Sequence, residues 1–176
     1  MRKFVKQKVI FILLMVCMTP SVNFATDVDF EYKLKALYIT RLADFIIWPE
    51  TTNRKAFKIC IDKMDKVAAQ LRALDIKRIL NRKLELVDKP DSLVIKQCDF
   101  LYLSAGKVPP LLENIAVFTL SSQPGFSEQG GMIEFYLDQS KVRMKVNLKA
   151  VNKVGIKLSS KLERLLKVVV PLEDDD

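Results

Sequence analysis

The residue types that perform most enzymatic chemistry are sparse in this chain. Histidine is absent from its 176 residues, which excludes Ser-His-Asp and Cys-His catalytic groups, imidazole pH switches and histidine-ligated metals. The first of its five glycines is Gly106, so neither a P-loop nor a dinucleotide-binding glycine motif can follow an early strand. Ser160 and Lys161 diverge by about 100° on a helix, so helix capping explains the serine better than nucleophilic catalysis. The sequence therefore predicts a protein that is not an enzyme and uses no metal or cofactor.

Two groups of residues remain as candidates for binding a partner or a ligand. The first is a polar loop that contains Glu128, Gln129, Gly130 and Gly131. Exposed backbone amides in this loop could form a binding surface, but glycine also supplies a positive φ before a strand, and we favour this structural interpretation. The second group is Asp62 and Ser104, which follow predicted strands. Ligands of α/β sheets bind beyond the carboxyl ends of strands, although any loop needs polar residues there.

The first 25 residues have the layout of a secretory signal peptide. Residues 1–8 carry four basic and no acidic side chains, residues 9–18 are an unbroken apolar run, and small residues follow near Ala25. Because about 20 apolar residues are needed to span a bilayer, we expect export with cleavage rather than a permanent membrane anchor. The mature chain, residues 26–176, then carries 25 basic and 21 acidic side chains. Its net charge of +4 argues against nucleic-acid binding.

Removal of the signal peptide takes Cys17 away and leaves Cys60 and Cys98. Two cysteines in an oxidising compartment can form one disulfide if their strands are neighbours. The alternative is a pair of buried free thiols. Both interpretations remain open from the residues alone, and the compartment favours the disulfide.

The apolar pattern of the mature chain alternates between strand and helix signals. A helix is predicted over residues 30–48, with Leu37 and Phe45 on its apolar stripe. Tyr38 and Trp48 could anchor an interface, but we favour a place in the core for both. The predicted strands cover residues 57–61, 84–87, 99–104, 115–120, 132–137 and 142–147. Further helices are predicted over residues 64–74, near Pro109-Pro110, over 148–154, and from a capping box at Ser160 with Leu162, Leu165, Leu166 and Val169 inward.

Strands that alternate with helices pair in parallel through right-handed crossovers. Residues 132–137 and 142–147, joined by a four-residue connection, instead read as an antiparallel hairpin. The sequence therefore predicts one α/β domain. Its sheet is mixed and mostly parallel, with about six strands, helices on both faces and a C-terminal β-hairpin followed by helices.

Three segments of the chain resemble the YfiR family of exported bacterial proteins. Residues 32–49, which end in Trp48-Pro49, resemble the opening helix of that family. Residues 124–135 resemble its most distinctive loop and strand, and residues 142–162 resemble its closing segment. Arg41 departs from the family pattern, which usually has asparagine there.

The resemblance implies a regulatory, non-enzymatic role. Characterised members are periplasmic repressors that bind the sensor part of an inner-membrane diguanylate cyclase, which restrains cyclic-di-GMP synthesis and biofilm formation. The resemblance also implies a homodimer that meets the membrane only through its signal peptide. Some members carry a cysteine pair at the positions of Cys60 and Cys98, which adds support for the disulfide. The alternative function is a periplasmic sensor domain that binds a small ligand.

Overall fold

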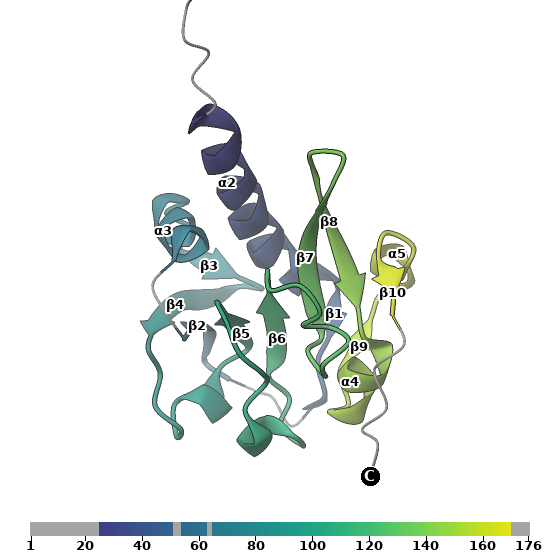
Figure 1. Ribbon diagram of the computed structural model, residues 1–176. Coiled ribbons are helices and arrows are strands. Elements are labelled where there is room, and N and C mark those ends of the chain that lie inside the picture. Colours follow the sequence, from purple (N-terminus) through teal and green to yellow (C-terminus); the bar gives the residue numbers. More distant parts are fainter. Residues whose placement is uncertain (1–24, 51–53, 63–64, 170–176) are drawn as a thin grey trace, which may run out of the picture.

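A mixed eight-stranded sheet forms the centre of the protein, in the order β10-β8-β7-β6-β5-β2-β4-β3 (Figure 1). The computed structural model describes residues 25–50, 54–62 and 65–169. The expected signal peptide therefore lies, except for Ala25, outside the described residues. The strands of the sheet are β2 (Ala56–Ile61), β3 (Arg78–Ile79), β4 (Arg82–Asp88), β5 (Phe100–Leu103), β6 (Phe118–Ser121), β7 (Ile133–Asp138), β8 (Lys141–Val146) and β10 (Lys167–Val168).

The remaining elements connect and cover this sheet. A separate pair of short strands joins β1 (Ile46–Ile47) to β9 (Lys157–Leu158). The α-helices are α2 (Ala25–Leu42), α3 (Lys66–Ala73), α4 (Leu148–Lys153) and α5 (Ser160–Glu163). The 3-10 helices are η1 (Ala43–Phe45), η3 (Ile95–Gln97) and η4 (Pro110–Leu112).

The predicted fold class is confirmed. Strands β4, β2, β5, β6 and β7 pair in parallel, and β7 and β8 form the predicted antiparallel hairpin. All six predicted strands are present. The sheet is larger because β3 and β10 extend its two edges, and strands of two residues are too short to show a periodic apolar pattern.

Side chains on the two faces of the sheet form two separate apolar clusters. The larger one, here called the helix-covered core, contains Phe57, Phe100 and Phe118 of the central strands and buried residues of all four α-helices. The smaller one, here called the loop-covered core, consists of Cys60, Ile95, Cys98, Leu101, Leu103, Leu112, Val117 and Phe126. On this second face the helical cover is limited to η3 and η4, and loops supply the rest.

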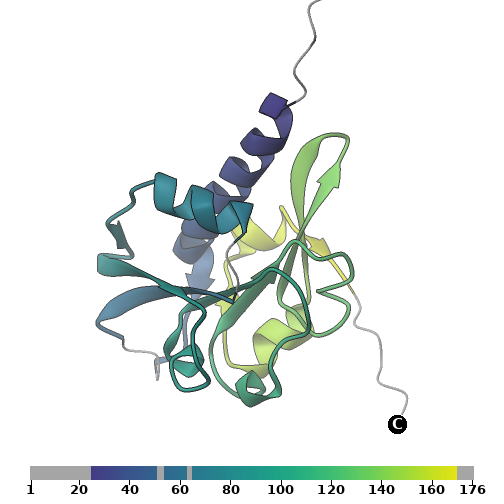
Figure 2. The same ribbon diagram turned by 60° about the vertical axis from the view of Figure 1, so that its left-hand side comes forward.

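The predicted N-terminal helix is shorter than expected. Residues 30–42 are helical as predicted, but the chain then passes through η1 into β1, where Ile46 pairs with Leu158 and the Ser159 N–H donates to the Phe45 carbonyl at 2.9 Å. Strand pairing with a distant segment outweighs the local helical pattern here. The buried stripe of α2 is also rotated from the expected one, since Leu37 is 39% exposed while Ala36 and Ile39 are fully buried. Figure 2 shows α2 extending beyond the sheet beside the β7–β8 hairpin.

The C-terminal helices are confirmed in part. Asn147 caps α4 by accepting the Ala150 N–H at 2.9 Å. Gly155 follows the helix with φ +75°, a left-handed conformation that glycine commonly adopts at the end of a helix. The last helix is a single turn that is capped by Ser159 rather than Ser160. Its predicted inward stripe holds for Leu162 and Leu166 but is wrong for Leu165, which is 69% exposed. The chain turns into β10 instead of continuing the helix, because pairing with β8 satisfies its backbone.

Candidate functional site

The glycine loop between β6 and β7 is held in place by close packing. Gly130 has φ +94°, which fits the predicted conformational role of a glycine. Gly131 is constrained differently, because a Cβ atom there would lie 2.1 Å from the ring of Phe126. That ring is buried in the loop-covered core, and the Gly131 N–H donates to the Phe126 carbonyl at 2.9 Å. The backbone conformation of Gly130 and the packing of Gly131 against Phe126 therefore explain why glycine occupies both positions. Gln129 and Gly130 are nevertheless exposed.

A network of polar side chains ties this loop to the hairpin beneath it. Glu134 is buried on β7, and its Oε2 accepts both the backbone N–H and the hydroxyl of Ser127, at 3.2 and 3.0 Å. Asn147 donates from Nδ2 to the Ser127 carbonyl at 2.9 Å. Lys145 on β8 donates from Nζ to Glu128 Oε1 at 3.0 Å and lies 3.1 Å from Glu134 Oε1. The loop is thus fixed by charge-assisted hydrogen bonds.

The same contacts set the charge state of the loop. Partial burial opposes ionisation of Glu128, but hydrogen bonds from Lys145, the backbone and Ser127 outweigh it and lower its pKa to about 2. The hydrogen bond to Glu128 in turn raises the pKa of Lys145 against the cost of its burial. Glu128 is therefore a carboxylate and Lys145 an ammonium at neutral pH.

A pocket of about 740 Å³ opens beside this loop, at the amino ends of β6 and β7. Gln129 and Gly130 form one wall, α4 forms another, and the segment that leads into η4 forms a third. Met132 and Thr119 lie on the floor, where the Met132 N–H donates to Thr119 Oγ1 at 3.1 Å. The first candidate group thus lines a pocket, except for Gly131.

The second candidate group lies at the opposite end of the sheet. Asp62 and Ser104 do come together, since the Ser104 N–H donates to Asp62 Oδ1 at 2.8 Å. The Ser104 hydroxyl donates to Asp65, which also caps α3 by accepting the Ala68 N–H at 2.8 Å. Nearby, burial raises the pKa of Tyr102, whose hydroxyl donates to Ser122 Oγ at 3.2 Å. These hydrogen bonds fasten the strand ends to one another, and ligand binding here stays a prediction.

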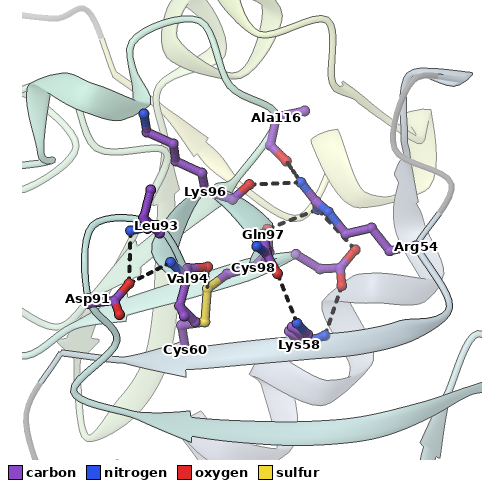
Figure 3. The surroundings of a disulfide bond; sticks show 11 residues. Arg54, Lys58, Cys60, Asp91, Leu93, Val94, Lys96, Gln97, Cys98 and Ala116 are labelled. Carbon is purple, nitrogen blue, oxygen red and sulfur yellow. Dashed lines mark hydrogen bonds and ion pairs between the residues drawn. A yellow bond between two sulfur atoms is a disulfide. The ribbon is translucent and has the colours of Figure 1, made fainter.

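Cys60 and Cys98 form a disulfide, with their Cα atoms 5.9 Å apart (Figure 3). Both residues are fully buried in the loop-covered core. Cys60 belongs to β2, and Cys98 lies between η3 and β5, which is the strand that pairs with β2. The favoured interpretation of the two cysteines is therefore confirmed.

A buried carboxylate next to the disulfide was missed by the sequence analysis. Asp99 is 1% exposed, and its Oδ1 lies 3.3 Å from Arg54 Nη1 and 3.0 Å from Arg82 Nη2. Its Oδ2 accepts the Lys58 N–H at 2.8 Å. Arg54 also donates to the carbonyls of Cys98, Lys96 and Ala116 (Figure 3). In the sequence, Asp99 is marked only as a charged residue next to an apolar strand. Glu134 is marked in the same way, as a charged residue within the apolar strand β7.

Other sequence predictions concern single residues or absent features. Trp48 and Tyr38 pack against the helix-covered core, and the Trp48 ring lies 6.0 Å from that of Phe100. Among the described residues, no group of three or more acidic or cysteine side chains could hold a metal ion. No helix within residues 25–50, 54–62 and 65–169 is both long and apolar enough to cross a membrane.

Comparison with known proteins gives one family. The family described as YfiR/HmsC-like matches residues 32–166, from the second turn of α2 to Leu166, the last buried residue of the helix-covered core. Its members are periplasmic regulators of diguanylate cyclases rather than enzymes. No curated protein matches the chain.

Proposed function

Because this chain belongs to the YfiR/HmsC-like family, we propose that it binds the periplasmic sensor part of an inner-membrane diguanylate cyclase and represses that enzyme. The observation that carries the proposal is the family match over residues 32–166, which spans every strand of the described sheet except β10. Repression lowers the synthesis of cyclic-di-GMP and thereby restrains biofilm formation. The exported chain acts by contact, and none of its residues performs a catalytic step.

The loop of Glu128, Gln129 and Gly130 is the contact surface that we propose. Gln129 and Gly130 are exposed, and the network below them fixes the backbone before any partner arrives. A preorganised loop loses little conformational entropy on binding, so more of its contact energy is available for affinity. Repression follows if the sensor part of the cyclase presents a matching surface only in its inactive state, because the regulator then shifts the population towards that state.

Deletion of the gene tests the proposal. We expect cellular cyclic-di-GMP to rise in the deletion strain and to return to its starting level when the intact gene is supplied. A gene carrying Gln129→Arg should fail to restore repression, because an exposed bulky cation replaces a neutral side chain at the contact surface. Gln139→Arg, at the exposed turn between β7 and β8, is the matched control and should restore it. Unchanged cyclic-di-GMP after deletion would contradict the proposed function.

Two further features belong to this proposal. Residues 1–25 are removed during export, and the mature chain of residues 26–176 forms a homodimer. The mass of the protein recovered from the periplasm reports the first feature, and light scattering of the purified protein reports the second.

A small-ligand sensor is the second candidate function. The pocket beside Gln129 favours it, although the sequence placed such a site near Asp62 and Ser104, at the other end of the sheet.

A further inference from the structure

The pocket at the amino ends of β6 and β7 has the size and the lining of a small-molecule site. Its volume of about 740 Å³ falls within the roughly 300–1,000 Å³ that ligand pockets usually occupy. Its floor includes Leu112, Val117 and Met132, which are all buried. Thr119 adds a hydroxyl on the floor that accepts the Met132 N–H and keeps its own proton to donate.

The charged side chains around the pocket leave two lysines without an acidic partner. Glu113 pairs with Lys153 at 2.8 Å, and Glu128 pairs with Lys145 at 3.0 Å. Both glutamates on the lining therefore already have a lysine partner, although Lys145 is shared between Glu128 and the buried Glu134. Lys107 and Lys149 also line the pocket, and no acidic side chain of the described residues forms an ion pair with either of them. Positive charge is thus in excess around an apolar floor.

We propose that this pocket binds a small organic carboxylate with an apolar body. Lys107 and Lys149 hold the carboxylate at the rim, while Leu112, Val117 and Met132 contact the apolar part. An ammonium ligand would meet unpaired lysines, and a wholly apolar ligand would leave their charge unused, so the lining favours an anion. The ligand would lie against Gln129 and Gly130, which places it beside the loop that we propose as the contact surface.

The inference does not depend on the identity of the protein partner. It concerns the pocket of the purified mature chain, and binding is measured without any cyclase. A failure of the ligand test would therefore leave the regulatory proposal standing, and unchanged cyclic-di-GMP in the deletion strain would leave the ligand proposal standing.

Two matched probes test the proposal by isothermal titration calorimetry and by NMR shifts. The probes are 4-phenylbutyrate, an anion with an apolar ring, and the neutral alcohol 4-phenylbutan-1-ol. Fragments of this size bind in roughly the millimolar range. We expect 4-phenylbutyrate to bind more tightly than the alcohol and to shift the signals of Leu112, Val117 and Met132.

Substitution of the lysines should separate charge from shape. Lys107→Gln and Lys149→Gln should each lower the affinity for 4-phenylbutyrate by about threefold, and the two together by about tenfold. The affinity for the alcohol should not change. Lys141→Gln, an exposed lysine of the β7–β8 hairpin, is the control and should change neither affinity. Three outcomes would each overturn the proposal: no saturable binding of 4-phenylbutyrate, equal affinity for the two probes, or equal weakening by Lys141→Gln.

Discussion

The two faces of the sheet bury their side chains in different ways. The helix-covered core packs Phe57, Phe100 and Phe118 against one another with ring centroids 5.1 and 5.5 Å apart, under helices that satisfy their own backbone hydrogen bonds. The loop-covered core is smaller and lies under segments with little regular structure. It holds the disulfide, and the Arg54 and Asp99 contacts lie beside it.

The difference shows what a loop needs in order to cover a sheet. A helix fixes its backbone through repeating hydrogen bonds, so burial of its apolar stripe is enough to hold it in place. A loop has no such repeat, and fixing each of its residues costs backbone entropy of about 1–2 kcal/mol. Cross-links between distant residues offset that cost here. The three predictions below test this account, because each removes one cross-link from the loop-covered side.

Loss of the disulfide should have the largest effect. Its cysteines are 38 residues apart, and closing a loop of that length in the unfolded chain stabilises the fold by about 4 kcal/mol. Cys60→Ala with Cys98→Ala should lower the free energy of unfolding by that amount in urea titrations. Hydrogen exchange should quicken in η3 and η4 before it changes in α2. A reductant should destabilise the parent protein and leave the double variant unchanged; equal effects on both would contradict the prediction.

Neutralising Asp99 should have the next largest effect. Asp99→Asn keeps an acceptor for the Lys58 N–H but leaves Arg54 and Arg82 without their buried counter-charge. Removing one partner of a buried ion pair costs about 3 kcal/mol or more, measurable as a lower midpoint of urea unfolding. Asp138→Asn is the control, because its pair with Arg143 is exposed and should contribute less than about 0.5 kcal/mol. Similar losses of unfolding free energy in the two variants would contradict the prediction that burial makes the Asp99 ion pairs more important than the exposed pair.

Glu128 should give the smallest effect and a characteristic pH dependence. Its pKa falls from an ordinary 4.5 to about 2 in the folded protein, so its contribution to stability is present above pH 4.5 and disappears as the pH falls towards 2. The side chain is 26% exposed, which limits that contribution to about 1 kcal/mol. Unfolding of the parent and of Glu128→Gln should therefore differ near pH 6 and converge near pH 2. A difference that persists at pH 2 would assign the effect to packing instead.

Local patterns were enough to predict most elements of the fold. The six main strands, α3, α4 with its Asn147 cap, and the hairpin depend on residue spacing over a few positions, which any window of the sequence displays. The predictions failed where a distant segment competed with the local pattern. Ile46 joined Leu158 in a strand pair instead of extending α2, and the segment after α5 joined β8.

The candidate site was predicted less completely for the same reason. Glu128, Gln129 and Gly130 were identified from the loop alone, but nothing in their spacing indicated that Lys107, Thr119 and Lys149 share a pocket with them. Gly131 was expected to provide backbone freedom, yet the constraint comes from the ring of Phe126. The role of Asp99 depends on Arg54 and Arg82, which lie on two other segments of the chain.

The sequence by itself determined the α/β class, the order of its elements and the absence of histidine chemistry, because composition and short-range periodicity carry that information. The tertiary structure decided whether Cys60 and Cys98 meet, which carboxylates are buried and which end of the sheet opens into a pocket. Those outcomes depend on the order of the strands in the sheet, which places residues far apart in the sequence next to one another.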